Sequence, residues 1–144
     1  MGMKILAAGV RRSFAVTIGT KPGYNALALP YTVEMVRDVV LDWLSDRMQR
    51  GLPILSGVLS QGHVLYAWPL GRGTEPVCVY AGEVSVVHCR DVGDTEVIGM
   101  LNELGGRLAE ELGQTRVYVS YRDEAWVLER EGGEPSPGGP PPSA

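Results

Sequence analysis

Two segments of this chain carry apolar residues three or four positions apart, which is the spacing of an α-helix with one buried face. In residues 32–51, the side chains predicted to share that face are Val33, Val36, Val40, Trp43, Leu44 and Met48. The opposite face is charged and includes Arg47, while Thr32 is placed to cap the start and Gly51 to end the pattern. We therefore predict a first helix here.

The second helical pattern spans residues 94–113. Its predicted buried side chains are Val97, Leu101, Leu104, Leu108 and Leu112. Asp94 or Thr95 is the predicted N-cap. Gly105 and Gly106 lie in the middle of this helix, where each glycine costs about 0.5–1 kcal/mol relative to alanine. We interpret the pair as a place where the sheet or another subunit approaches the helix closely.

The remaining apolar segments alternate with polar residues or are rich in β-branched residues, as strands are. The predicted strands are residues 13–19, 53–68, 75–89 and 115–129, with a candidate edge strand at 4–10. The run 53–68 is broken near Ser60–Gly62, and the run 75–89 changes phase across Ala81–Gly82. Each of these two runs is therefore either one bent strand or a hairpin.

The order β-α-β-β-α-β predicts an α+β fold, a two-layer sandwich of ferredoxin-like type with further strand breaks allowed. Both helices then cover one face of a mainly antiparallel sheet. Residues 1–130 form the predicted domain, and 131–144, which are almost entirely Gly, Pro, Ser and Glu, form a predicted disordered tail.

The second face of such a sheet has no helical cover, yet its predicted residues include Tyr66, Trp68 and Tyr118. A single layer of helices cannot bury apolar side chains on both faces. Uncovered apolar surface of this kind marks an interface or a ligand site. We therefore predict a homo-oligomer.

Composition excludes several classes of function. The formal charge is −4, which favours neither nucleic acid nor an anionic membrane as a partner. No apolar run approaches the roughly 20 residues of a membrane span, and we expect a cytoplasmic protein. Cys78 and Cys89 are predicted free thiols, because neither a single strand nor a hairpin brings them within bonding distance. With only His63 and His88 as histidines, we predict no metal and no cofactor.

The stretch Gly19–Asn25, "GTKPGYN", follows a strand and precedes a helix, which is a general setting for anion binding. It lacks both GxxxxGK[ST] and GxGxxG, so it is either a ligand-contacting loop or a plain turn. The polar run "YRDEAW" is likewise either an exposed turn with a local ion pair or part of a pocket. The candidate ligand-binding residues are Lys21, Tyr24, Asn25, Arg116, Tyr121, Arg122 and Asp123.

No catalytic signature is present, and this favours a non-enzymatic homo-oligomeric module. It would bind a small ligand, anionic or nucleotide-like, or a protein partner, and act by sequestration or sensing. One alternative is a small enzyme that uses His63 or His88 as a general base. Another is a purely structural assembly component.

Overall fold

The structure, a computed structural model, describes residues 2–20, 31–68 and 71–131. The predicted tail therefore lies outside the described residues from position 132 onward. The elements follow the order β1 (Ser13–Gly19), α1 (Val33–Gln49), β2 (Val58–Trp68), β3 (Gly71–Glu83), α2 (Asp94–Glu111), β4 (Arg116–Tyr121) and β5 (Glu124–Glu129).

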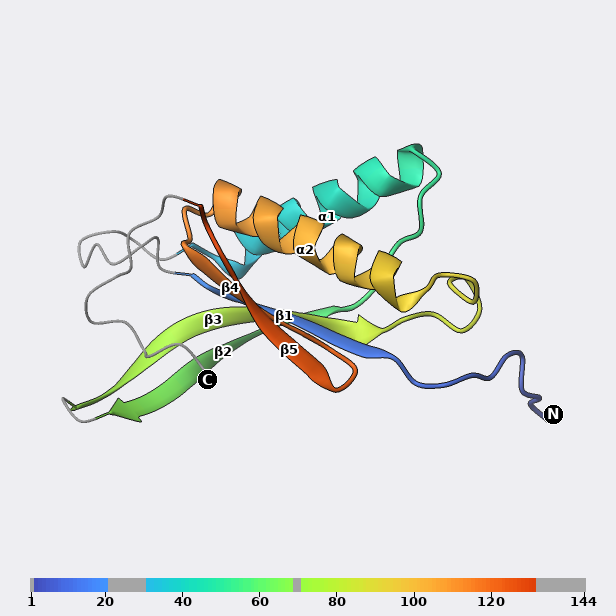
Figure 1. Ribbon diagram of the computed structural model, residues 1–144, viewed down its shortest axis with the longest axis horizontal. Coiled ribbons are helices and arrows are strands. Elements are labelled where there is room, and N and C mark those ends of the chain that lie inside the picture. The colour runs from blue at the N-terminus through green and yellow to red at the C-terminus, as the bar shows by residue number, and fades with distance from the viewer. Residues whose placement is uncertain (1, 21–30, 69–70, 132–144) are drawn as a thin grey trace.

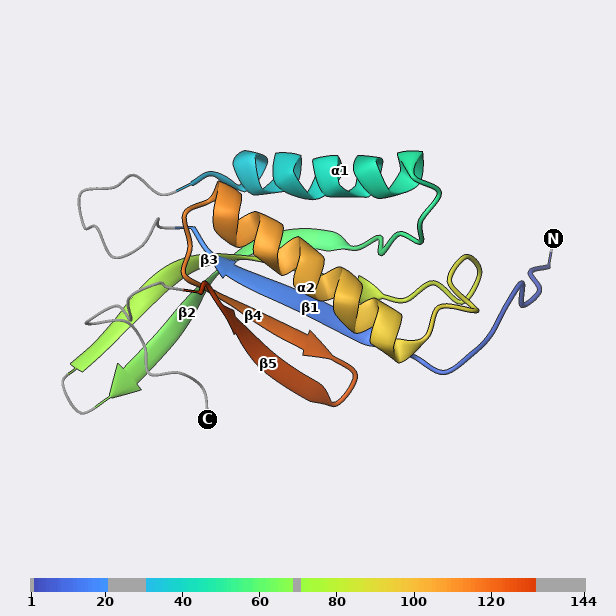
Figure 2. The ribbon, with the colours of Figure 1, turned by 45° about the horizontal axis from the view of Figure 1, so that its top comes forward.

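The five strands form one sheet in the order β2-β3-β1-β4-β5, and every pairing is antiparallel. Both helices lie on the same face of this sheet (Figures 1 and 2). The predicted two-layer α+β sandwich is confirmed, and the order of its first four strands fits the ferredoxin-like arrangement. The fifth strand arises because the predicted strand 115–129 is a hairpin that turns at Arg122, whose φ is 55°.

The core lies between the helices and the sheet. Phe14, Val16 and Ile18 point inward from β1, and alternate residues of β4 do the same. From the helices, the buried apolar side chains are Val36, Val39, Val40 and Trp43 on α1, and Val97, Met100, Leu101, Leu104 and Leu108 on α2. The helical spacing in the sequence therefore identified the face of each helix that packs on the sheet.

Two residues of α1 lie opposite to their predicted faces. Arg47, predicted to face solvent, is only 5% exposed, and Met48, predicted to be buried, is exposed. The Arg47 guanidinium lies over the Trp43 ring, donates to the carbonyl oxygen of Pro53 at 2.7 Å and pairs with Glu103 of α2 at 3.4 Å. These partners replace water around a buried charge, which no pattern of apolar residues reveals.

The helix ends follow ordinary capping chemistry. The Thr32 hydroxyl accepts from the backbone N–H of Met35 at 3.2 Å, which confirms the predicted cap of α1. The N-cap of α2 is Gly93 and not Asp94 or Thr95. A Cβ atom at Gly105 would lie 2.5 Å from Cδ1 of Leu128 on β5, so the sheet approaches the helix there through a side chain and not through its backbone, whereas a Cβ atom at Gly106 would meet nothing within 4 Å.

The two central runs pair with each other as one long hairpin. β2 continues without a break through Gly62, and β3 continues through Ala81–Gly82 to Glu83, so the predicted interruptions are wrong. The chain after β3 turns instead of extending to Cys89. Residues 4–10 form no strand. Both cysteines are free and buried, as predicted.

Within the described ranges, neither helix combines the length and the apolar character that a membrane crossing requires.

Candidate active site

The structure separates the residues that the sequence proposed as one ligand site. Lys21, Tyr24 and Asn25 lie outside the described residues. Arg116 begins β4 and bonds to Glu129 of β5 at 3.4 Å. Tyr121, Arg122 and Asp123 lie at the other end of β4 and in the turn that follows it. A shared role of these residues in ligand binding stays a prediction.

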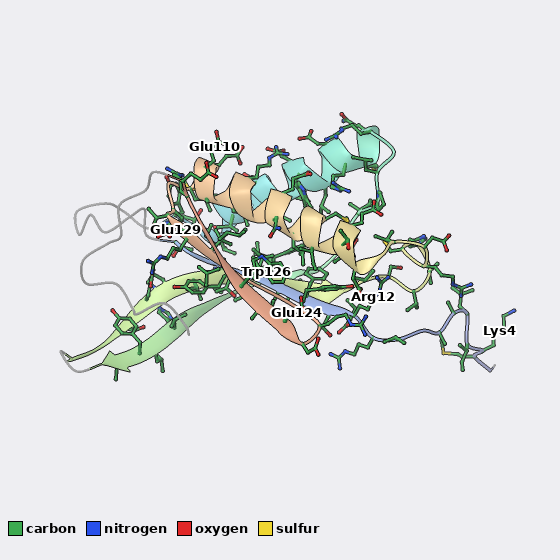
Figure 3. The ribbon with its side chains drawn as sticks, in the orientation of Figure 1. Lys4, Arg12, Glu110, Glu124, Trp126 and Glu129 are labelled. Carbon is green, nitrogen blue, oxygen red and sulfur yellow. The ribbon has the colours of Figure 1, made fainter. Side chains whose placement is uncertain are left out.

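One end of the sheet holds a compact group of charged and polar side chains, here called the Arg12 cluster: Arg12, Asp94, Tyr121 and Arg122. Arg12 lies just before β1 (Figure 3), and its side chain is 16% exposed. It donates to the carbonyl oxygens of Val92 at 2.6 Å and Cys89 at 3.1 Å. The same guanidinium lies 3.5 Å from a carboxylate oxygen of Asp94, so one side chain fixes the turn that leads into α2.

The remaining contacts of the Arg12 cluster converge on Asp94. The Tyr121 hydroxyl donates to Oδ1 of Asp94 at 2.5 Å, and Arg122 donates to Oδ2 at 3.2 Å. The hydrogen bond from Tyr121, followed by the charge of Arg122 and the contact with Arg12, lowers the pKa of Asp94. Burial, followed by the bond to Asp94, raises the pKa of Tyr121. These groups satisfy one another, and Tyr121 at 2% exposed has no open ring face to offer a ligand.

The opposite end of β1 opens into a groove of about 440 Å³, here called the Glu34 groove. Its lining comes from residues on either side of positions 21–30 and from the β2–β3 hairpin: Thr20, Tyr31, Glu34, Gln61, His63 and Cys78. The groove therefore lies between the start of α1 and the helix-side surface of the hairpin.

Backbone hydrogen bonds hold the walls of the Glu34 groove in place. The N–H of Thr20 donates to the carbonyl oxygen of Pro76 at 3.1 Å, which extends the β1–β3 contact beyond the strand. The carbonyl oxygen of Thr20 accepts from the N–H of Tyr31 at 2.5 Å. These bonds bring the chain back to the sheet just before α1 begins, although ten residues separate the two positions.

The chemistry of the groove centres on Glu34. Among the described residues that line it, Glu34 is the only one with a formal charge at neutral pH, and it lies in the first turn of α1. The helix dipole favours an ionised carboxylate at that position. Burial, and then the negative charge of Glu34, raise the pKa of the Cys78 thiol at the groove. Such a groove favours a ligand that brings positive charge close to Glu34.

The two histidines have different surroundings. His63 lies on β2, pairs across the hairpin with Pro76 and lines the Glu34 groove. His88 lies in the exposed turn after β3, where its backbone N–H donates to the Ser85 hydroxyl at 3.0 Å. Only His63 is therefore placed to act on a molecule in the groove.

Sequence reasoning missed most of this groove. Thr20 belonged to the loop considered for ligand contact but was not singled out, Glu34 was not among the candidate ligand residues, and His63 entered only through the enzyme alternative. The available signal was a strand end followed by a long loop and a helix whose first turn carries an acidic residue.

No protein family matches this sequence, and neither does any curated protein. Solved structures do match the fold. A phage SAM lyase in complex with S-methyl-5'-thioadenosine is similar with a TM-score of 0.66 and 20% identity, over 92% of this chain and 100% of that one. A phage SAM lyase in the apo state is similar with a TM-score of 0.64 and 22% identity, over 93% of this chain and 100% of that one.

These likenesses correct the prediction of a non-enzymatic module. That prediction rested on the absence of familiar catalytic signatures. The similar solved chains are matched over their full length, and both are an enzyme. This fold is therefore compatible with catalysis, and the absence of familiar signatures is no argument against an enzyme. The non-enzymatic prediction is therefore wrong, and the alternative of a small enzyme is better supported.

Proposed function

We propose that this chain is an enzyme that cleaves S-adenosylmethionine and releases S-methyl-5'-thioadenosine. The observation that carries the proposal is the likeness to phage SAM lyase over nearly the whole chain, combined with an acidic groove in the described residues. The fold alone does not establish an activity. The size and charge of the groove provide the additional support.

The dimensions of the Glu34 groove suit such a substrate. Small-molecule sites are commonly clefts of about 300–1,000 Å³ lined by apolar and aromatic side chains with a few polar groups. At about 440 Å³, with Tyr31 and Val77 in its lining beside Thr20 and Gln61, the groove is within that range. A nucleoside with a short sulfur-containing side chain is a ligand of suitable size.

The charge of the groove supports the same substrate. S-Adenosylmethionine carries a positive sulfonium and a positive ammonium group, whereas the thioadenosine product is neutral. The Glu34 carboxylate attracts either cation, and this attraction is stronger in a partly enclosed site than in bulk water. After cleavage the thioadenosine product carries no charge for Glu34 to hold, so the electrostatic contribution to its retention is lost.

Two routes of cleavage account for all atoms and electrons. In both, the bond between sulfur and the amino-acid fragment breaks, and its electron pair stays on sulfur as a neutral thioether. In an elimination, the neighbouring carbon loses a proton to a base and a double bond forms. In an internal displacement, the substrate's own carboxylate attacks the carbon and closes a ring. We assign His63 as the base of the first route, and the second route requires no base.

The test is to incubate purified protein with S-adenosylmethionine and follow both products by liquid chromatography and mass spectrometry. We expect thioadenosine to form faster than in buffer alone. The four-carbon product distinguishes an unsaturated amino acid from a lactone. Release no faster than in buffer would contradict the proposed activity.

The chain supplies a matched pair of variants for the role of histidine. His63→Gln removes the base in the groove, and His88→Gln makes the same change in the distant turn. If His63 accepts the proton, its variant loses about 100-fold or more in rate, which is the scale of general-base catalysis. The His88 variant is expected to keep the full rate. Equal rates in both variants would exclude His63 as the base and favour the internal displacement.

We also propose that the chain is homo-oligomeric. What supports this is the outer face of the sheet, which neither helix covers and which presents Ala15, Thr17, Tyr118 and Val127. Apolar surface of this kind is usually an interface.

A further inference from the structure

The β2–β3 hairpin is longer than the sheet that supports it. β1 pairs with β3 between Val77 and Glu83, and the N–H of Thr20 extends this contact to Pro76, whereas β2 pairs with β3 out to Trp68 and Gly71. Five cross-strand pairs, from Val64–Glu75 to Trp68–Gly71, therefore have no third strand beside them among the described residues. Figures 1 and 2 show this segment projecting from the body of the molecule. It is called the hairpin arm below.

The hairpin arm carries apolar side chains on both of its surfaces. Leu65 is 78% exposed and Val64 is 38% exposed, and as neighbours on a strand they point to opposite faces. On the Val64 face, Tyr66 lies over Gly73, where an added Cβ atom would meet the tyrosine hydroxyl at 2.6 Å. An isolated two-stranded hairpin is marginally stable in water, so this arm requires cover.

A hollow of about 390 Å³ lies in the outer face of the same sheet, over β1, β4 and β5. Uncharged side chains, most of them small, shape it: Ala15, Thr17, Tyr118, Ser120, Ala125 and Val127. Its residues on β1 and β4 alternate with those that point into the core, so this outer-face hollow is on the side of the sheet opposite to both helices. It has the dimensions to accept one or two apolar side chains without placing a charge out of water.

We propose that the hairpin arm of one copy docks in the outer-face hollow of a second copy of this chain. Leu65 is more exposed than Val64 and carries no charge, and none of the residues that line the hollow carries one, so Leu65 can enter the hollow without placing an ion there. Within one copy the two surfaces cannot meet, because β3 and β1 separate β2 from β4 in the sheet. A second copy is the partner that presents the complementary surface in equal amount.

The size of the contact indicates how copies arrange. Five pairs at about 3.3 Å each give an arm of roughly 16 Å, which alone buries less than the about 800 Å² per partner of a standard interface. If every copy both gives an arm and receives one, the buried area per chain doubles. We therefore expect a closed assembly in which each hollow is filled. This arrangement does not depend on the proposed cleavage of S-adenosylmethionine.

The first test compares masses in solution by sedimentation velocity over a dilution series. The unchanged chain is expected to exceed its monomer mass of 15.5 kDa. Leu65→Asp places a charge in the proposed contact and is expected to yield monomers. Val87→Asp, at a residue 48% exposed in the turn after β3, is the control and is expected to assemble normally. A monomeric unchanged chain, or assembly unaffected by Leu65→Asp, would overturn the proposal.

A second test does not require the arm to tolerate a charge. Leu65→Cys and Ser120→Cys are made in separate chains, mixed, and treated with a short thiol crosslinker, while Cys78 and Cys89 are buried. A covalent dimer that forms in the mixture, and much less in either variant alone, is the expected result. Equal crosslinking in all three samples would overturn the pairing of arm and hollow. Thioadenosine release, measured in the same samples, tests the activity separately.

Discussion

At the Ser13 end of β1 the ionised side chains are paired with one another, whereas at the Gly19 end a carboxylate faces open space. Arg12, Asp94 and Arg122 form a closed network with Tyr121. The Glu34 carboxylate has no hydrogen bond or ion pair with another residue in the described parts of the chain, and it lies in a groove. Charges that satisfy one another stabilise a fold, whereas a charge left facing a groove is available to a ligand.

The most severe test of this contrast is Arg12→Met. It removes a mostly buried cation that holds two backbone carbonyls and Asp94. We expect the free energy of unfolding to fall by about 3 kcal/mol, because the carbonyls and the carboxylate lose a charged donor. Urea unfolding followed by circular dichroism measures this. Arg11→Ala is the control: Arg11 is exposed, and its side chain pairs with Glu83 alone among the described residues, so we expect a loss of less than about 0.5 kcal/mol.

The contrast predicts the opposite outcome for Glu34→Gln. In this variant the rate of thioadenosine release should fall about 100-fold, because the groove loses its attraction for the cationic substrate; a factor of 100 corresponds to about 2.7 kcal/mol. The free energy of unfolding should stay within about 0.5 kcal/mol, since no described partner of the carboxylate is lost. Paired kinetics and urea unfolding measure the two effects. A large loss of stability with an unchanged rate would reverse the roles of the two ends.

The smallest effect concerns acid stability. In the folded protein the pKa of Asp94 is lowered below its ordinary value of 3.8. Ionisation of this carboxylate therefore stabilises the folded state relative to the unfolded state. Its contribution is present above that value and is lost as pH falls through the lowered pKa. Below pH 4 the unchanged chain should therefore lose stability more steeply than Asp94→Asn. Thermal unfolding between pH 2.5 and 5 measures the slopes, and parallel slopes would exclude Asp94 from acid unfolding.

The sequence predicted the layers because each helix shows its buried face within its own residues. The prediction of buried and exposed positions was wrong where a side chain depends on a distant partner. Arg47 appears solvent-facing in the sequence because Glu103, which holds it, comes more than fifty positions later. The start of β3 was missed because Gly71 and Gly73 resemble a loop, and only the pairing with β2 brings Tyr66 over Gly73.

The candidate site was less predictable than the fold. The densest polar run, "YRDEAW", contains an exposed turn at Arg122–Asp123, and Arg122 forms an ion pair with the distant residue Asp94. The groove combines Thr20, Glu34 and His63 from three separate elements, and no local motif connects them. Their proximity results from strand register and from the return of the chain to Thr20.

The floor of the groove and the hairpin arm are parts of the same two strands. Gln61 and His63 line the groove, and Leu65 lies only two residues beyond His63 on the same strand. A paired two-stranded ribbon of this kind is stiff along its length, so its two ends move together. An arm that is docked in a second copy therefore holds the surface of the groove in place. We expect the groove to bind its ligand more tightly as protein concentration rises, because more arms are then docked.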